Sequence, residues 1–196
     1  MSDLTQEELA GLPVISFATV HDCETWFAEH HADHRGLWLK IGKVGAAETV
    51  TYAEALEVAL CHGWIDGQKR GHDEAYWLQR FTPRGPRSTW SQINRDKAEA
   101  LIAAGRMRPA GQAQVDAAKA DGRWEAAYAG QKSATVPHDL AAALAADPEA
   151  EAFFGTLTGA NRYAILYRVH DAKKPETRAA RIAKFVELCH NHETLH

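Results

Sequence analysis

The apolar residues of the N-terminal half fall in short runs separated by polar or glycine-containing stretches. Residues 14–17 and 37–41 are bulky and apolar, and each run is short enough to be a buried strand. Residues 64–67 and 76–81 predict two further strands, and residues 21–31 have the character of a helix. This pattern predicts a small mixed β-sheet packed by helices.

One helix of this half is marked at both ends. Thr51 and Glu54 have the spacing of a capping box, in which each side chain accepts a hydrogen bond from the other residue's backbone. Apolar side chains recur four, seven and eight positions after Tyr52, so they share one helical face. Gly63 suits the left-handed residue that commonly ends a helix. The sequence therefore predicts a helix that ends just before Gly63.

The C-terminal half carries helical signals and little strand signal. Residues 91–104 and 112–121 are helical and each stretch stops at a glycine, and a small polar linker follows at residues 129–135. Four short helices are then expected, with start signals at Pro137, Asp147-Pro148, Thr158 and Pro175. The chain is thus predicted to be α+β, with an N-terminal α+β module over residues 12–128 and an all-helical C-terminal module over residues 136–190.

Composition and charge narrow the classes of function. The chain has 196 residues, 45% of them hydrophobic, and a formal net charge of −4, which argues against general attraction to nucleic acid or anionic lipid. Its three cysteines are scattered, which is typical of free thiols in a reducing compartment. Residues 1–12 lack the basic and apolar regions of a secretory signal, and no apolar run is long enough to span a membrane. We expect a cytoplasmic protein.

The strongest candidate for a site is formed by two segments of the predicted sheet region. If the strands that contain Asp66 and Arg80 are neighbours, the carboxylate could face Arg80 or Arg84. Guanidinium groups suit carboxylates and phosphates, and the prolines around them restrict the loop. The predicted site for a small anion or a peptide comprises Trp64, Asp66, Arg80, Arg84, Arg87 and Trp90. The alternative is structural: an ion pair that holds the loop, and tryptophans that fill the core.

A catalytic interpretation of the same region is the runner-up. His62 and Asp66 could act as an acid–base pair with an arginine, which would make the chain an enzyme of unassigned class. Cys61 is a poor nucleophile for His62 to activate, because adjacent residues of a helix do not face each other. The sequence also lacks the phosphate-binding loop, the dinucleotide fingerprint and the nucleophile elbow. We therefore assign no catalytic residue and expect a binding protein rather than an enzyme.

Two histidine groups were considered as metal ligands. His30 and His34 share a helical face, but the residues between them do not form the zinc hydrolase motif. A second group lies at the C-terminus, where a solvated tail explains it: Cys189, His190, His192 and His196. We expect no metal and no cofactor.

A basic stripe between Arg162 and Lys184 is the basis of a third functional hypothesis. Arg178 and Arg181 lie one helical turn apart, so their side chains share a face and could meet phosphate groups or an acidic partner. The alternative is a solvated face whose arginines pair with acids elsewhere. With a net negative chain we do not expect nucleic acid to be the partner.

Several motifs along the chain are characteristic of one family. They are residues 59–67 and 80–91, then 105–107, 109–111 and 121–124, and finally 161–167, 172–173 and 175–178. With these motifs, spread over residues 36–188, the chain resembles the OmpD-associated, YdeI-type bacteriocin-protection family. The resemblance implies protection against bacteriocins and antimicrobial peptides, an association with an outer-membrane porin, and a helical terminal module. It implies no catalytic residues.

Together these observations predict a non-enzymatic stress protein that protects bacteria against antimicrobial peptides. Its expected partner is a small anion, a peptide or a protein, bound near the segments Trp64–Asp66 and Arg80–Trp90. His62, Arg178 and Arg181 are secondary candidates for contact with that partner.

Overall fold

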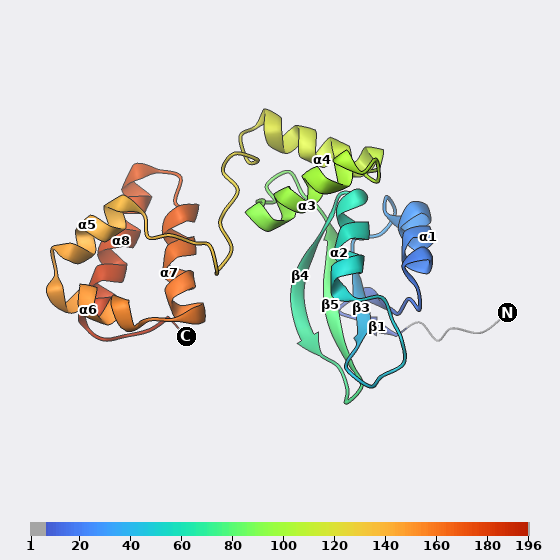
Figure 1. Cartoon of the computed structure of the whole chain (residues 1–196), viewed down its shortest axis with the longest axis horizontal. Coiled ribbons are helices and arrows are strands. Elements are labelled where there is room, and N and C mark those ends of the chain that lie inside the picture. Colours follow the sequence, from blue (N-terminus) through green and yellow to red (C-terminus); the bar gives the residue numbers. More distant parts are fainter. Residues whose placement is uncertain (1–6, 196) are drawn as a thin grey trace. The chain divides into compact units, whose positions relative to one another are not determined.

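The computed structural model describes residues 7–195, and these residues form two compact units. The first unit contains the described residues up to Thr89 together with Asn94–Glu125. The second contains Trp90–Ile93 and the chain from Ala126 onward. Strands occur in the first unit and helices make up most of the second (Figure 1), so the predicted α+β class is confirmed. The predicted module boundaries, 12–128 and 136–190, stay a prediction.

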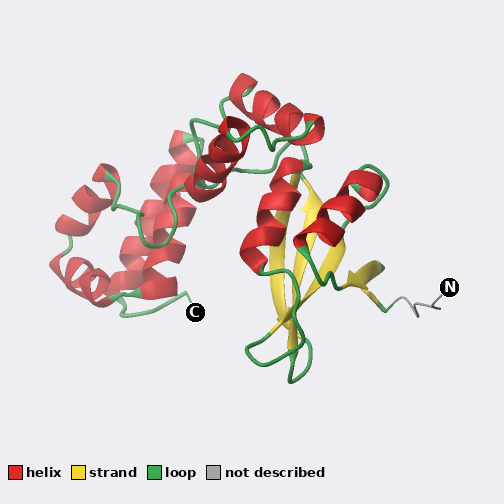
Figure 2. Ribbon diagram, turned by 45° about the vertical axis from the view of Figure 1, so that its right-hand side comes forward, coloured by secondary structure: helices red, strands yellow, loops and turns green. Residues whose placement is uncertain are grey.

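The first unit is built on a mixed sheet with the strand order β1-β2-β3-β5-β4. β2 and β3 are parallel, and the other neighbours are antiparallel. Helices α1 (Val20–His30) and α2 (Tyr52–Cys61) lie side by side on one face of the sheet (Figure 2). The strands are β1 (Glu8–Leu9), β2 (Leu12–Ile15), β3 (Leu37–Gly42), β4 (Trp64–Gly71) and β5 (Tyr76–Pro83).

Helix α2 forms as its sequence predicts. The Thr51 hydroxyl accepts a hydrogen bond from the backbone N–H of Glu54, and the Glu54 carboxylate accepts one from the backbone N–H of Thr51. The hydrogen bonds that the backbone N–H and the hydroxyl of Thr51 donate to the Glu54 carboxylate lower the pKa of Glu54. Gly63 has φ +75° and reverses the chain into β4, and a side chain there would lie 2.8 Å from the carbonyl oxygen of Ala110. Two separate constraints therefore require glycine at position 63: the positive φ and the close carbonyl oxygen of Ala110.

Helices α3 (Gln92–Ala103) and α4 (Pro109–Ala120) follow the sheet. The first turn of α4 packs directly on the last turn of α2. A Cβ on Gly111 would lie 2.3 Å from the carbonyl oxygen of Cys61 and 2.6 Å from that of Leu60. Because both neighbours are backbone atoms, the two helices approach this closely only with glycine at position 111.

The second unit contains four short helices, as predicted. The side chain of Asp147 caps α6 by accepting from the backbone N–H of Ala150, as its start signal indicated. Pro137 precedes the first of these helices rather than occupying its first turn, and the Thr158 side chain makes no capping bond. A continuous apolar core joins the helices and includes Phe154, Ile165 and Phe185. The helices are α5 (His138–Ala145), α6 (Pro148–Thr156), α7 (Gly159–Asp171) and α8 (Pro175–His190).

The three cysteines are unpaired, as predicted, and they lie in the interior. Cys23, Cys61 and Cys189 are free and buried, and burial raises the pKa of each thiol, that of Cys23 to about 12. Among residues 7–195, no helix is long and apolar enough to cross a bilayer.

The contact between α2 and α4 gives a first testable prediction. Gly111→Ala should lower the stability of the first unit by about 1–3 kcal/mol, because the added methyl group overlaps two backbone oxygens and forces the helices apart. Thermal and urea unfolding measure this loss. Gly71→Ala is the control, since nothing lies within 4 Å of the added methyl group and φ is not in the left-handed region. Equal stability of the two variants would show that the contact is looser than described.

Candidate functional site

The two strands of the predicted site are neighbours, but the structure does not bring Asp66 and Arg80 together. β4 pairs with β5 so that Asp66 lies directly opposite Phe81. Residues opposite each other share one face of the sheet, whereas Arg80, the residue next to Phe81, projects from the other face. The Arg80 side chain accordingly lies against Gly67, 3.8 Å from the position of a Cβ there. The two charges are on opposite sides of the sheet.

Asp66 and Trp64 instead make contacts on the helix-covered face. The Tyr52 hydroxyl, from the first residue of α2, donates a 2.8 Å hydrogen bond to the Asp66 carboxylate. Trp64 is 1% exposed, and its indole N–H donates to the carbonyl oxygen of His31 at 3.0 Å. Its ring meets that of Phe27 edge to face, with centroids 5.1 Å apart. These contacts fasten the two helices to the sheet.

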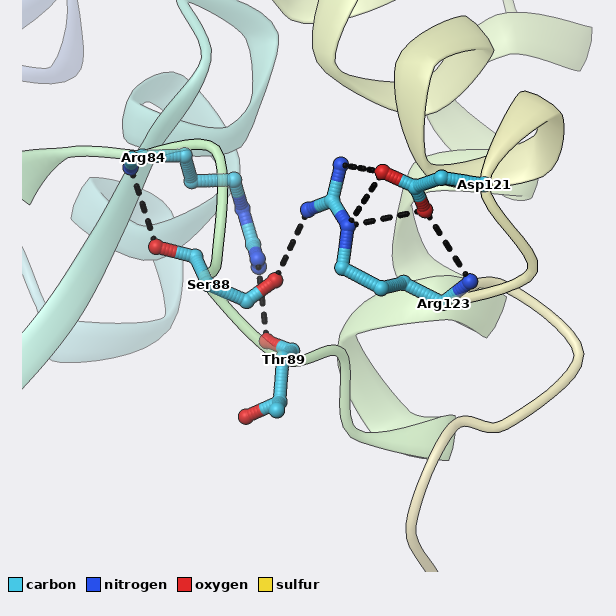
Figure 3. A network of polar contacts seen from close by, with 6 residues as sticks. Arg84, Ser88, Thr89, Asp121 and Arg123 are labelled. Atoms are coloured by element: carbon cyan, nitrogen blue, oxygen red, sulfur yellow. Dashed lines mark hydrogen bonds and ion pairs between the residues drawn. The ribbon is translucent and has the colours of Figure 1, made fainter. Parts of the chain in front are cut away.

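Arg84 is buried in the loop that follows β5. Its backbone N–H donates to Gly63, and its guanidinium donates to the carbonyl oxygen of Thr89 at 3.2 Å. Arg123 holds the same loop from the other side (Figure 3): it donates to the carbonyl oxygen of Ser88 at 2.9 Å while it is paired with Asp121. The hydrogen bonds from Arg123 lower the pKa of Asp121. Two guanidinium groups thus shape this loop by binding its carbonyl oxygens.

The remaining two residues of the predicted site are placed differently from each other. Arg87 is exposed at the tip of the loop. Trp90 is 2% exposed and belongs to the second unit, where its carbonyl oxygen accepts from the backbone N–H of Tyr128. The six residues therefore do not lie within one compact unit. Their proposed role in binding stays a prediction.

His62 makes no hydrogen bond or ion pair with Asp66 among the described residues, and its ring lies in aromatic surroundings. It is 7% exposed, its ring lies 5.0 Å from that of His31 and 5.8 Å from that of Phe27, and its Nδ1 has no hydrogen-bond partner. Burial, with smaller contributions from His31 and Arg108, lowers the pKa of His62 to about 4. The imidazole is therefore neutral at physiological pH.

The basic stripe of α8 is engaged by neighbouring groups of its own unit. Arg178 binds the Asp139 carboxylate through two hydrogen bonds and donates a third to the carbonyl oxygen of Val169. Arg181 donates to the carbonyl oxygen of Arg168 and pairs with Asp171 at 3.3 Å. Arg178 and Arg181 are thus both paired with acids. Among the described residues, no group of three or more His, Cys, Asp or Glu side chains could hold a metal ion, and His196 lies outside these residues.

The second unit contains a cavity that the sequence did not indicate. It has a volume of about 320 Å³, within the usual range for ligand pockets. Its wall includes three tyrosine rings, a proline, an imidazole and a guanidinium group: Tyr128, Tyr163, Tyr167, Pro137, His170 and Arg178. We call this space the tyrosine cavity. All of its lining residues belong to the second unit.

Helix α7 and one short backbone pairing position the three rings. Tyr163, Tyr167 and His170 are spaced four and three residues apart, so they lie along one face of α7. Tyr128 is held by a parallel bridge to Ser91, where the backbone N–H of Gln92 donates to the Tyr128 carbonyl oxygen at 2.9 Å. The rings of Tyr128 and Tyr167 meet edge to face with centroids 5.0 Å apart. A rigid aromatic wall results.

The charges around the tyrosine cavity are balanced. The hydrogen bonds between Arg178 and Asp139 lower the pKa of the carboxyl group and raise that of the guanidinium, so both stay ionised at neutral pH. Burial raises the pKa of Tyr163, whose hydroxyl donates to the carbonyl oxygen of Ala129 at 3.1 Å. His170 donates from Nε2 to the carbonyl oxygen of Ala126. The cavity offers flat rings, hydroxyl groups and one neutralised arginine, which suits binding better than acid–base chemistry.

In comparisons with known proteins, two family models match different parts of the chain. Residues 15–114 match the model of a family described as a domain of unknown function, DUF8412. Residues 133–192 match the family described as bacteriocin-protection, YdeI or OmpD-associated, which confirms that resemblance for the C-terminal part of the chain. Neither curated proteins nor solved structures gave a match. The tyrosine cavity is formed mostly by the second matched region, and Gln92 adds to it from the first.

The burial of His62 predicts how the stability of the first unit depends on pH. Because its folded pKa of about 4 is below the unfolded value near 6.5, the unfolded chain binds more protons between these values. The unit should therefore lose stability as the pH falls from 6.5 to 4, by an amount on the order of 3 kcal/mol at most. Urea unfolding at a series of pH values measures the loss.

Two variants isolate the contribution of this imidazole. His62→Gln should remove most of the pH dependence, whereas His21→Gln, at an exposed histidine of the same unit, should retain it. An NMR titration follows the ring of His62 directly. A midpoint near 6.5 would contradict the burial described here.

Proposed function

The chain belongs to the DUF8412 family, and from that premise, with the bacteriocin-protection match of its C-terminal part, we propose that it is a non-enzymatic protection protein that captures a peptide in the tyrosine cavity. The peptide is a segment of a bacteriocin or another antimicrobial peptide. One observation carries the proposal: the region that matches the bacteriocin-protection family contains most of a cavity lined by three tyrosines.

The chemistry of the wall favours a peptide over a free small anion. Tyrosine rings provide large, rigid contact surfaces at a low entropic cost, and their hydroxyl groups adapt to peptide N–H and C=O groups. Arg178 would be the obvious group to bind an anion, but both oxygens of Asp139 already accept its hydrogen bonds. An added anion would have to compete with this carboxylate, whereas a neutral backbone would not.

The cavity also discriminates by size. A volume of about 320 Å³ accommodates one or two side chains of a peptide, not a folded protein domain. Pro137 and Leu166 add apolar surface beside the rings, which favours aromatic or aliphatic side chains of the captured segment. Sequestration by binding needs no catalytic group.

The proposal predicts that truncation of the rings weakens both peptide binding and protection. Labelled peptides that tile a bacteriocin sequence are titrated with the protein, and fluorescence anisotropy reports binding. Tyr163→Ala with Tyr167→Ala should weaken the best peptide by about tenfold or more, since tyrosines at the centre of an interface commonly contribute above about 1 kcal/mol each. Bacteria that produce the wild-type chain should survive higher bacteriocin concentrations than those that produce this variant.

Phe153→Ala is the matched control. Phe153 is a partly buried aromatic residue of the same unit that stacks on His192, and it does not line the tyrosine cavity. Tyr163→Phe with Tyr167→Phe keeps the rings and tests the hydroxyl groups alone. If the double alanine variant folds, as judged by circular dichroism, and protects cells as well as the wild type does, the proposal is wrong.

A further inference from the structure

A second, smaller cavity lies in the first unit, where α2 ends and the segment between α3 and α4 passes over it. Its volume is about 130 Å³, and its wall includes Cys61, His62, Arg106 and Arg108, with Glu24 from α1. Liquid water occupies about 30 Å³ per molecule, so the space corresponds to a few waters or one small oxyanion. This cavity shares no lining residue with the tyrosine cavity.

His62 supplies a buried polar side chain that lacks a partner. The residue is 7% exposed and lines the cavity, and its ring makes no hydrogen bond within the described structure. A buried polar side chain without a partner is uncommon in folded proteins and calls for an explanation, such as a bound ligand. Because the ring is neutral at physiological pH, one of its nitrogens carries a proton and can donate it to an acceptor.

The two arginines in the wall of this cavity differ in the hydrogen bonds and ion pairs that their side chains already make. Arg106 donates a 2.8 Å hydrogen bond to Glu57 and lies 3.9 Å from Glu24, so its charge is compensated. No hydrogen bond or ion pair of the Arg108 side chain is found in the described residues, and the side chain is exposed. Its positive charge nevertheless acts on two groups of the wall: it adds to the lowering that burial causes in the pKa of His62, and it partly offsets the rise that burial causes in the pKa of Cys61.

The backbone adds to this positive potential. Arg108 is the N-cap of α4, a helix of 12 residues, and no side chain caps its first turn. A helix N-terminus carries a partial positive charge and attracts anions. The partial negative charge of the carbonyl oxygens at the end of α2 is partly compensated, because the backbone N–H of Arg108 donates a 3.2 Å hydrogen bond to the carbonyl oxygen of Cys61. Burial keeps the Cys61 thiol neutral by raising its pKa, so it adds no negative charge.

We propose that this cavity binds one small tetrahedral oxyanion, with inorganic phosphate as the representative ligand. The guanidinium of Arg108 pairs with the anion from the exposed side, and the His62 imidazole donates to it from the buried side. A metal cation does not fit, because the described residues contain no cluster of three metal-binding side chains. The role of this site is independent of peptide capture in the second unit.

Phosphate titration of the full chain tests the proposal. Inorganic phosphate is added at constant ionic strength, and the imidazole signals of His62 are followed by NMR while calorimetry measures the affinity. The expected result is saturable movement of the His62 signals at millimolar phosphate, with a rise in the unfolding temperature. Sulfate should compete and chloride should not, which separates an oxyanion site from a general salt effect.

Variants assign the binding to the two residues. Arg108→Gln should weaken phosphate binding tenfold or more, Arg108→Lys should weaken it less, and Arg70→Gln, at an exposed arginine of the same unit outside the cavity, should leave it unchanged. His62→Phe fills the space without a donor and should also remove binding. The proposal is overturned if the His62 signals do not move up to tens of millimolar phosphate, or if Arg108→Gln folds and binds as the wild type does.

Discussion

The first unit depends on the close approach of the end of α2 to the first turn of α4, which a glycine on each side allows. Gly63 faces the carbonyl of Ala110, and Gly111 faces the carbonyl of Cys61. At each of the two positions, the backbone of the opposite segment occupies the space that a side chain would need. The carbonyl oxygen of Gly63 also accepts the backbone N–H of Arg84, which joins the loop after β5 to the same point. Sheet, loop and α4 therefore meet where α2 stops.

This junction explains why the smaller cavity exists. Gly111 holds the first turn of α4 against the end of α2, so the segment that leads into α4 passes close to the same helix end. Side chains of α2 and of this segment then enclose a space. His62 is the residue immediately before Gly63, so the turn that requires glycine also fixes the position of the imidazole. A polar ring is thereby held at a buried place where the protein gives its Nδ1 no partner.

In the second unit, helix α7 uses different side chains for core packing and for lining the tyrosine cavity. Ile165 and Val169 of α7 enter the apolar core of the helical unit, whereas Tyr163 and Tyr167 line the tyrosine cavity. Arg178 ties the arrangement together, since it links α8 to Asp139 of α5 and to a carbonyl of α7. Arg178 and Arg181, which suggested anion binding in the sequence, thus have structural roles, and the tyrosines of α7 line a cavity.

The sequence by itself determined the local structure well. The capping box of α2, the left-handed turn at Gly63, the side-chain cap at Asp147 and the four C-terminal helices were all predicted, because each depends on residues within one or two helical turns of each other. The spacing of Tyr163, Tyr167 and His170 was equally visible and could have indicated an aromatic face. Ile165 and Val169 lie on the core face of the same helix.

Only the tertiary structure decided which side chains meet. Asp66 and Arg80 lie on neighbouring strands as expected, yet a register in which Asp66 opposes Phe81 places them on opposite faces. The pairing of Ser91 with Tyr128 assigns Trp90 to the second unit, and no local pattern signals a bridge between residues so distant in the chain. Register and long-range pairing follow from the packing of whole faces, and the spacing of residues within one segment carries no information about them.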